Sequence, residues 1–498
     1  MYIKTKKIIC KYKNVLMILA TIISTCIIYF NYLIGHFSAE TYALAHGYES
    51  YAINVYIADG RIFSGLLMIF ADLINIPIIN LMSISLFLGI CIAVIAIYKM
   101  KNTIMELLKI NQKQEIIIWL ICYTIIFNFI MIEMLHFPEA CIMSLSILFN
   151  IIAANYFINN KYIKSAIFLF LGVFCYQATI GFFIVCCCLF SLMQNKGLKN
   201  LLNNFIKIGI ISLVVAIINL SFIKIFTSLF QINQNKIFEL NIETIYDNII
   251  FIFKSVFKIL SENCGLFPKY FLILFIQLVV IMASIITLKE KDFKIIINAI
   301  ILLFITIVSS FVIFIVQKNS MFTGRVHFCI GSLVGIEFLY LYSSTTIKNY
   351  KFLKYFFYII LSTYILINII NTVQLTYEHQ LVNKLEKEEC KKIENIIEQY
   401  ESQNNIIIKK IVPIAIFNEE ENGFFKETIR RTIVTYNNIR HYFGFSSVIN
   451  YYINRKLEAT SITQNSQEKY LEYIINNNHE YGDVVCIDDS LYCPQYIF

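Results

Sequence analysis

Acidic, histidine and arginine side chains follow directly after the first long apolar run of the chain. Glu40, His46, Glu49, Asp59 and Arg61 all lie between positions 37 and 61. Ionisable groups are costly to hold beside apolar surroundings. A cluster of them at the end of an apolar run therefore indicates a site that binds or transforms a charged or polar molecule. A carboxylate can take a proton from a hydroxyl group, and an arginine can bind a phosphate through two parallel hydrogen bonds. This residue set suits the transfer of a sugar from a lipid phosphate.

The composition identifies the class of protein. Of the 498 residues, 58% are apolar and only 15% are charged, and apolar runs of nearly membrane-spanning length recur along the chain. The sequence predicts an all-α polytopic membrane protein. The formal net charge of +8 comes from lysines in short loops, which indicates membrane orientation and argues against a nucleic-acid partner.

Lysines and apolar runs together predict the topology. Five lysines precede the first run, so the positive-inside rule places the N-terminus in the cytoplasm and the acidic segment outside. Residues 62–74 are expected to lie on the outer interface as an amphipathic helix. The pattern predicts about eleven transmembrane helices, in residues 15–34, 78–98, 116–135, 140–157, 165–193 (two), 208–230, 270–288, 295–316, 326–341 and 353–373.

The uncharged run from Ser165 to Met193 allows two interpretations. As one helix it would be about 43 Å long, more than a single span needs. As a hairpin of two short helices it would keep the later lysine-rich loops in the cytoplasm, which the charge rule favours. The hairpin would place Tyr176 and Gln177 at an outer turn.

The composition changes at Tyr377. Residues 1–376 form the predicted membrane domain, and residues 377–498 form a smaller extracytoplasmic region with an opening amphipathic helix and strands at 406–417 and 484–487. We expect a small α/β fold there. Cys486 and Cys493 are either bridged or free, and the sequence leaves both alternatives open.

On this topology, polar groups from distant parts of the chain reach one outer surface. Each also has a simpler explanation, because outer loops contact water, Asp59 can cap the following helix, and Arg325 can extend to lipid headgroups. Glu133 and Glu337 lie near or within apolar runs, where packing roles are also common. The outer set is Glu40, His46, Glu49, Asp59, Arg61, His136, Glu139, Tyr176, Gln177, Arg325 and His327.

Several catalytic motifs are absent from the sequence. It has no Walker A loop, no Gly-x-Ser-x-Gly elbow and no His-Glu-x-x-His, which argues against an ATPase, an α/β-hydrolase and a zincin. No cytoplasmic loop is long enough to fold as a nucleotide-sugar-binding domain. A sugar donor would therefore have to come from the membrane.

The chain resembles the Gtr-type membrane glucosyltransferases within the GT-C superfamily. The similarity rests on Ala39-Glu40, Asp59-Gly60-Arg61, Cys175-Tyr176-Gln177-Ala178, Gly324-Arg325 and the C-terminal Tyr492-Cys-Pro494. The family usually has paired aspartates in the first outer loop, where this sequence has Ala39-Glu40. The resemblance implies a GT-C-like fold and transfer of glucose or a similar hexose from a polyprenyl-phosphate donor.

The resemblance also implies roles for individual residues. Glu40 would be the catalytic residue, either the base that activates the acceptor or the acid that positions the donor, and Arg61 and Arg325 would bind the donor phosphate. Sugar or lipid contacts are expected from Glu49, Asp59, Tyr176, Gln177 and His327. No cofactor is assigned, and the sequence leaves the use of a divalent metal open.

These expectations describe a multi-pass enzyme of the bacterial cytoplasmic membrane. Its partners would be the polyprenyl-phosphate sugar donor, a surface polysaccharide or glycolipid acceptor, and membrane lipids. The alternatives are a glycolipid or polysaccharide flippase, which would need polar residues along a path through the bilayer, and a polysaccharide polymerase, which would use a diphosphate-linked donor.

Overall fold

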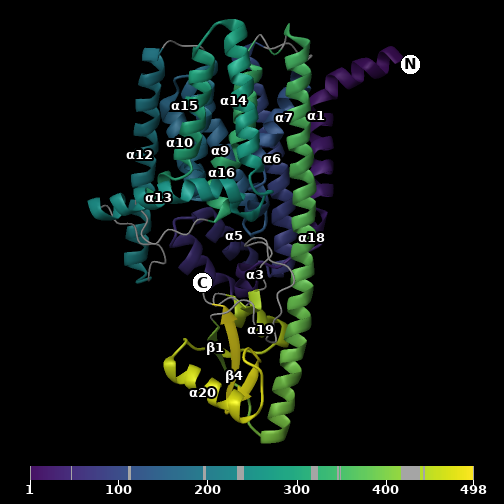
Figure 1. Cartoon of the computed structure of the whole chain (residues 1–498), viewed down its shortest axis with the longest axis vertical. Helices are drawn as coiled ribbons and strands as arrows, with labels where there is room; N and C mark the ends of the chain where they lie inside the picture. The colour runs from purple at the N-terminus through teal and green to yellow at the C-terminus, as the bar shows by residue number, and fades with distance from the viewer. Residues whose placement is uncertain are drawn as a thin grey trace.

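The computed structural model consists of a long helical bundle and a small α/β unit packed at one end of it, and helix α18 runs through both (Figure 1). The structure describes residues 2–45, 47–109, 114–194, 198–232, 241–315, 323–344, 347, 349–416, 438–440 and 444–496. The end of the bundle that carries the α/β unit is called the lower end, as in Figure 1.

Eleven of the described helices run along the length of the bundle. They are α1 (Tyr2–Ile28), α6 (Ile78–Leu108), α7 (Glu115–Ile126), α9 (Ala140–Ile158), α10 (Tyr162–Cys175), α11 (Ile180–Met193), α12 (Leu198–Leu229), α14 (Phe271–Glu290), α15 (Lys294–Ser309), α16 (Phe328–Tyr342) and the first part of α18 (Lys351–Asn404). The connections carry α2 (Phe30–Leu33), α3 (Ala39–Leu44), α4 (Tyr48–Tyr51), η1 (Ala52–Ile57), α5 (Ile62–Leu73), α8 (Met131–Leu135), η3 (Gln177–Thr179), α13 (Ile242–Glu262), η4 (Asn263–Gly265), η5 (Val312–Ile315) and η6 (Gly324–His327).

Length and apolar composition make this a membrane-embedded α-helical protein. Among the described residues, six helices are long and apolar enough to cross a bilayer, and six shorter apolar helices accompany them. Large apolar side chains such as Leu213, Phe304 and Ile359 are more than half exposed on the outside of the bundle, where lipid would cover them. The membrane class is as predicted, whereas the GT-C class and the count of about eleven spans remain predictions.

The run from Ser165 to Met193 forms a hairpin, which was the favoured interpretation. Tyr176 has an extended backbone (φ −159°, ψ 109°) and separates α10 from η3 and α11. Tyr162 at the start of α10 accepts a hydrogen bond from Lys207 Nζ at 2.9 Å, and Ser191 near the end of α11 accepts one from Asn204 Nδ2 at 3.2 Å. Both donors lie in the first turns of α12, so α10 and α11 run in opposite directions.

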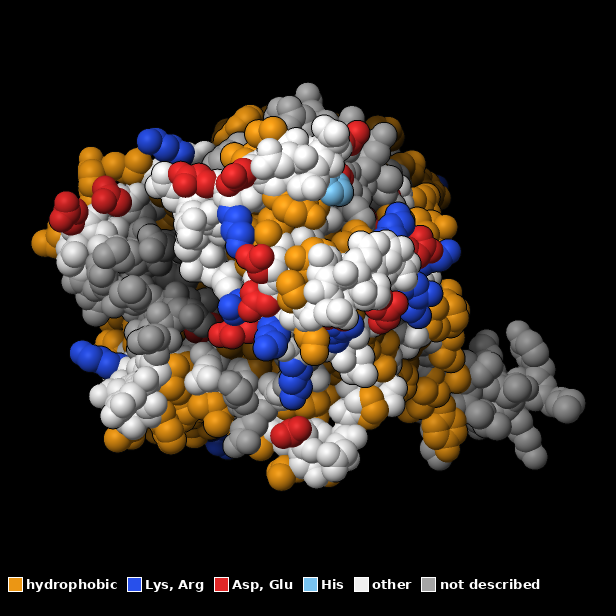
Figure 2. Space-filling model, turned by 90° about the horizontal axis from the view of Figure 1, so that it is seen from below, with side chains coloured by type: hydrophobic (Ala, Val, Ile, Leu, Met, Phe, Trp, Pro, Cys, Tyr) orange, Lys and Arg blue, Asp and Glu red, His pale blue; other side chains and the backbone are white. Residues whose placement is uncertain are grey.

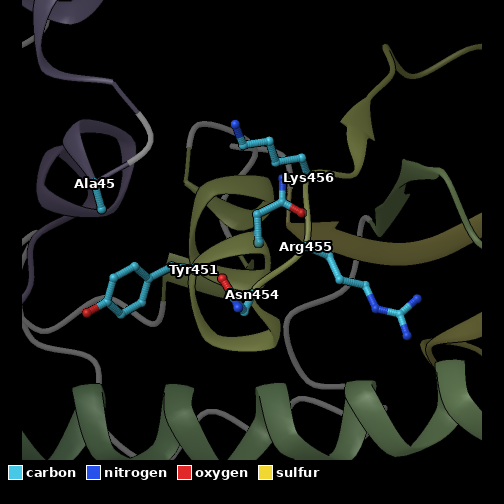
Figure 3. A pocket seen from close by; sticks show the side chains of 6 residues that line it. Ala45, Tyr451, Asn454, Arg455 and Lys456 are labelled. Carbon is cyan, nitrogen blue, oxygen red and sulfur yellow. The ribbon is translucent and has the colours of Figure 1, made fainter.

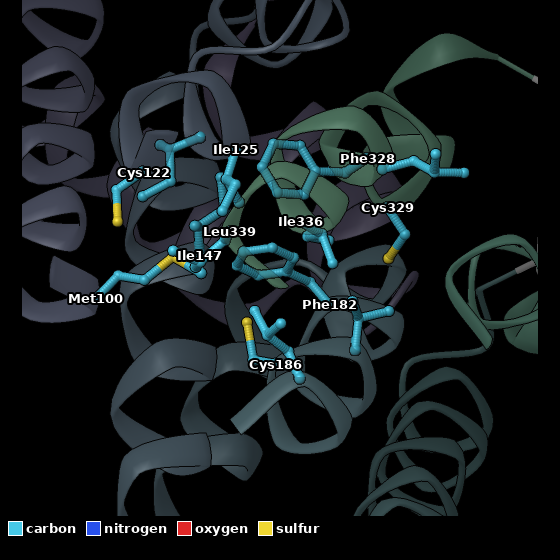
Figure 4. Close-up of a cluster of buried hydrophobic side chains, with 14 of the residues drawn as sticks. Met100, Cys122, Ile125, Ile147, Phe182, Cys186, Phe328, Cys329, Ile336 and Leu339 are labelled. Atoms are coloured by element: carbon cyan, nitrogen blue, oxygen red, sulfur yellow. The ribbon is translucent and has the colours of Figure 1, made fainter. Parts of the chain in front are cut away.

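The core of the bundle is apolar and closely packed. Figure 4 shows side chains of α7, α9, α11 and α16, among them Phe182, Phe328 and Leu339, which are all fully buried. Small residues permit the closest helix approaches: a Cβ at Gly181 in α11 would lie 2.2 Å from the backbone oxygen of Ser309 in α15. Close backbone approach of this kind is typical of helix packing in membranes.

Helix α18 carries the chain out of the bundle without interruption. It has 54 residues, which makes it about 81 Å long, and it continues below the bundle to the α/β unit (Figure 1). The predicted boundary between residues 376 and 377 therefore falls inside one helix. The change in composition at Tyr377 corresponds to a change in the surroundings of α18, because a helix can pass from apolar to polar surroundings without breaking.

The C-terminal part is a small α/β unit, as expected. Its four-stranded sheet has the order β2-β1-β4-β3, in which β1 pairs in parallel with β2 and β4, and β3 is antiparallel to β4. The predicted strands appear as β1 and β3, and Cys486 and Cys493 are both free thiols, so they are not bridged. The elements are β1 (Lys410–Ile416), η8 (Asn438–Arg440), α19 (Phe445–Ile453), β2 (Glu458–Ala459), α20 (Gln464–Asn476), β3 (Val485–Ile487) and β4 (Ser490–Tyr496).

A buried carboxylate joins the α/β unit to the bundle. Glu386 on α18 accepts hydrogen bonds from the Tyr42 hydroxyl of α3 at 2.8 Å and from the backbone and side-chain nitrogens of Asn438 at 2.6 and 2.8 Å. The lower end itself carries both acidic and basic side chains, whereas apolar ones dominate its rim in the view from below (Figure 2). This charge distribution fits an end that faces water.

Candidate active site

Six of the predicted site residues converge at the lower end of the bundle. Glu40 and Arg325 form an ion pair, Arg61 pairs with Asp59, and Gln177 donates to the backbone of Asp59. Tyr176 stands next to Gln177 and influences the same arginines electrostatically. The site therefore combines the connection after α1, the hairpin turn and the start of α16.

Glu40 is held at the beginning of α3. Ser38 caps this helix, because its hydroxyl accepts from the backbone of Thr41 while the Thr41 hydroxyl accepts from the backbone of Ser38. Glu40 thus lies in the first helical turn, where a negative charge is favourable. Its Oε1 lies 3.8 Å from Arg325 Nη2, and the two side chains are 18% and 19% exposed. Both members of this ion pair are therefore partly exposed.

Arg61 is the buried cation of the site. Its Nη1 donates to Glu139 Oε1 at 3.0 Å, its Nη2 lies 3.4 Å from Asp59 Oδ2, and its guanidinium stands over the Tyr56 ring at 4.7 Å. Burial alone would lower the pKa of Arg61, but the carboxylates of Glu139 and Asp59 outweigh it and raise that pKa. Arg61 therefore remains charged.

The turn before α5 depends on Gly60. Its φ of +80° is unfavourable for other residues, and a Cβ there would lie 2.7 Å from Gln177 Nε2 and from Ile223 Cδ1. The predicted tight turn is present, but the suggested capping role of Asp59 is wrong: the N-cap of α5 is Arg61, with no side-chain cap hydrogen bond. Asp59 instead pairs with the arginine, with its Oδ2 3.4 Å from Arg61 Nη2.

Arg325 is oriented by groups from the segment between α7 and α9. Its backbone N–H donates to Glu133 Oε2 at 2.6 Å, and its guanidinium lies 4.0 Å from the centre of the Phe137 ring. A cation over an aromatic face is held without blocking its outward N–H groups. Arg325 is thus placed beside Glu40 and remains partly exposed.

The hairpin turn closes one side of the site. Gln177 Nε2 donates to the carbonyl of Asp59 and lies 3.4 Å from Asn219 Oδ1 of α12, and Asn219 Nδ2 in turn lies 3.4 Å from the Gly60 carbonyl. Tyr176 is buried. These contacts show Gln177 fixing the Asp59–Arg61 turn.

One predicted residue, His327, lies apart from this group. His327 is fully buried against the rings of Phe311 and Phe314, at 4.9 and 5.6 Å between centroids, so its predicted sugar contact has no open face. It follows Arg325 by two residues, and the turn of η6 directs it inward. The side chain of Glu49 and the whole of His46 lie outside the described residues.

Tyr56 and Glu139 complete the site and were not among the assigned residues. The Tyr56 hydroxyl lies 2.9 Å from Glu40 Oε2 and 2.9 Å from Glu139 Oε2, so it bridges the two carboxyl groups. Tyr56 is in the π-helical turn η1, a conformation often found at functional sites. Glu139 is recognisable in sequence as an outer acid, but nothing in the pattern distinguishes Tyr56 from other tyrosines.

Burial controls the protonation of these two groups. Burial raises the pKa of the Glu139 carboxyl to about 7, the charge of Glu40 raises it as well, and Arg61 opposes both. Burial, followed by the charges of Glu139 and Glu40, raises the pKa of Tyr56 well above its usual value. Tyr56 therefore keeps its proton at neutral pH.

Comparison with known proteins gives no relative: no family model, no curated protein and no solved structure matches the chain. Within the described residues, no group of three or more histidine, cysteine, aspartate or glutamate side chains has the arrangement needed to hold a metal ion. The chemistry of the site is therefore argued from its own side chains.

An apolar cavity is lined in part by the residues that follow Arg61. It has a volume of about 350 Å³ and is lined by residues of α5, α10 and α12, namely Ile62, Phe63, Phe170, Phe174, Ile218 and Phe222. Ile62 follows Arg61 directly, and Phe174 precedes Tyr176 by two positions. A molecule with a charged head and an apolar tail could occupy the site and this cavity together.

A second cavity lies between α3 and α19. It has a volume of about 380 Å³, and Figure 3 shows Ala45 on one side and Tyr451, Asn454, Arg455 and Lys456 on the other. Arg455 is already engaged, since its two terminal nitrogens donate to Glu401 at 2.7 and 3.1 Å. This polar cavity borders the C-terminal end of α3, the helix that carries Glu40 in its first turn.

Proposed function

We propose that this protein is a GT-C-like membrane glycosyltransferase that moves glucose or a similar hexose from a polyprenyl-phosphate donor to a cell-surface glycan. The observation that carries the proposal is the partly exposed pair of Glu40 and Arg325, with their side chains 3.8 Å apart. At this spacing, the base can take the proton of the acceptor hydroxyl while the cation binds the phosphate of the donor.

The reaction forms one bond and breaks another. The acceptor hydroxyl attacks the anomeric carbon, its proton passes to Glu40, and the bond between that carbon and the phosphate oxygen breaks. The polyprenyl phosphate leaves with the bonding electron pair, and a cation held in a mostly dry site stabilises this developing charge.

The two arginines contribute differently to phosphate binding. Arg325 is the accessible contact, because its ion pair with Glu40 is long and partly exposed. Arg61 is buried and bound to Glu139 and Asp59, so it would stabilise the phosphate by electrostatic attraction and not by direct contact. The apolar cavity beside Arg61 would receive the first isoprene units of the carrier.

In the proposed orientation the N-terminus is cytoplasmic and the lower end, with the α/β unit, is extracytoplasmic. Lysine-rich connections then lie in the cytoplasm, as the charge rule requires. The acceptor would reach Glu40 from the water-facing end. The proposed location is the bacterial cytoplasmic membrane, crossed about eleven times.

Substitution of the central pair tests the proposal. In membranes supplied with labelled undecaprenyl-phosphate-glucose, Glu40→Gln and Arg325→Ala should each reduce sugar transfer at least 100-fold, a typical loss for general-base and oxyanion-stabilising groups. Protein abundance should not change. Glu106→Gln, on an exposed acid at the far end of α6, is the matched control and should transfer normally. Normal transfer by both test variants would reject the assignment.

A further inference from the structure

The Tyr56 hydroxyl contacts two carboxyl groups but has only one proton. It lies 2.9 Å from Glu40 Oε2 and 2.9 Å from Glu139 Oε2. An ionised carboxylate only accepts hydrogen bonds, so Tyr56 can donate to one of them and must accept from the other. For both contacts to be hydrogen bonds, one of the two carboxyl groups must carry a proton.

The surroundings indicate which carboxyl group carries it. Glu139 is completely buried, whereas the Glu40 side chain is 18% exposed, so desolvation disfavours a charge on Glu139 more strongly. The elevated pKa of Glu139, about 7, has the same origin. A proton on Oε2 also leaves Glu139 Oε1 free to accept from Arg61 Nη1, as observed at 3.0 Å.

Other charged and titratable groups also surround the pair. Arg61 and Arg325 favour the ionised form of Glu139, whereas the charge of Glu40 disfavours it. Tyr51 and Tyr176 are neutral, because burial raises the pKa of both phenols. The remaining carboxyl groups are Asp59, which pairs with Arg61, and Glu133, which accepts from the Arg325 backbone.

We infer that Glu139 is a neutral acid which, through Tyr56, holds Glu40 ionised and correctly oriented as the base of the proposed reaction. The hydrogen bonds run in one direction, from Glu139 to Tyr56 and from Tyr56 to Glu40 Oε2. Oε1 of Glu40 is then left to receive the acceptor proton. Tyr56 and Glu139 are positioning residues, and this inference rests on the proposed function.

The pH dependence of transfer follows from this arrangement. As the pH rises through about 7, Glu139 loses its proton, and Tyr56 then faces two carboxylates and can donate to only one. Glu40 loses its fixed orientation for part of the time, so transfer should decline on the alkaline side with a midpoint near this pH.

Two variants separate this role from simple packing. Glu139→Gln resembles the protonated acid, since its amide can donate to Tyr56, so it should lose the alkaline decline. Tyr56→Phe breaks the connection and should lower kcat roughly tenfold or more, with little change in KM for the donor and no alkaline decline. Tyr48→Phe, which removes a hydroxyl bound to the Ile76 carbonyl, is the matched control and should behave as wild type.

Infrared spectroscopy gives a readout that does not require transfer. In the full-length protein titrated across neutrality, the protonated-carboxyl absorption should decrease with a midpoint near pH 7. Buried Glu386, whose pKa burial also raises to about 7, contributes to this change in every variant, so Glu139→Gln should lose only the Glu139 part of the decrease and Tyr48→Phe should lose none of it. A decrease of undiminished amplitude in Glu139→Gln, or an unchanged alkaline decline in both test variants, would overturn the inference. If the titration is as expected but no sugar is transferred, only the proposed function fails.

Discussion

Arg61 and Arg325 carry the same charge in different surroundings. Arg61 is enclosed by Glu139, Asp59 and the Tyr56 ring, whereas Arg325 lies at the edge of the site beside Glu40. Removing one member of a buried charge group leaves its partners uncompensated, but a partly exposed ion pair contributes little to stability. The same substitution should therefore affect folding at one position and activity at the other.

At the residue scale, Arg61→Ala should lower the free energy of unfolding by about 3–5 kcal/mol, because buried Asp59 loses its cation and buried Glu139 loses a hydrogen-bond donor. Arg325→Ala should lower it by about 1 kcal/mol or less. Thermal unfolding of the purified proteins in one detergent provides the comparison. Equal stability of the two variants would show that Arg61 does not have the structural role described above.

At the element scale, the packing of helices determines where the site residues lie. One close contact is between α11 and α15, where Gly181 meets the backbone oxygen of Ser309. Helix α11 belongs to the hairpin whose turn carries Tyr176 and Gln177, so separation of α11 from α15 would also displace the site.

Substitution of glycines in two helices tests this packing. Gly181→Ala should destabilise the protein by about 1–3 kcal/mol, since the added Cβ would lie 2.2 Å from a backbone atom that cannot rotate away. Gly209→Ala in α12, which would meet nothing within 4 Å, should be neutral or stabilise by about 0.5–1 kcal/mol through helix propensity. The unfolding midpoints of the two purified variants measure these changes in stability. An unchanged midpoint for Gly181→Ala would contradict the close packing of α11 against α15.

The hairpin, the turn at Gly60 and strands β1 and β3 could be predicted, because charge position, turn residues and apolar alternation are local signals. The continuity of α18 could not, since a change of composition at Tyr377 does not by itself end a helix. The inward side chain of His327 and the Tyr56 bridge also could not, because both depend on distances between segments far apart in the sequence. Glu139 lies 99 positions after Glu40 and meets it only in the fold.

The protein as a whole has two chemically different ends. The lower end carries the site and the α/β unit, and lysines stand in connections at the other end, for example Lys109 after α6 and Lys291 after α14. The positive-inside rule assigns that lysine-bearing end to the cytoplasm. The acceptor glycan would then meet the site outside the cell membrane.

Cysteine labelling of intact cells tests this orientation. With a membrane-impermeant thiol reagent, Lys469→Cys in the α/β unit should be labelled and Lys291→Cys should not, although both positions are exposed. After the membrane is permeabilised, both should react. Labelling of Lys291→Cys alone on intact cells would place the lower end in the cytoplasm and would contradict the proposed orientation.

The most direct test of the central claim uses the purified full-length protein in lipid discs with polyprenyl phosphate carrying a labelled hexose and a surface-glycan acceptor. We predict that label moves to the acceptor as a single hexose, that unlabelled polyprenyl phosphate is released in equal amount, and that Glu40→Gln abolishes both changes. Flipping of the lipid without transfer, or failure to use this donor while a diphosphate-linked oligosaccharide is consumed, would contradict the assignment of the Glu40–Arg325 site as a hexosyltransferase centre.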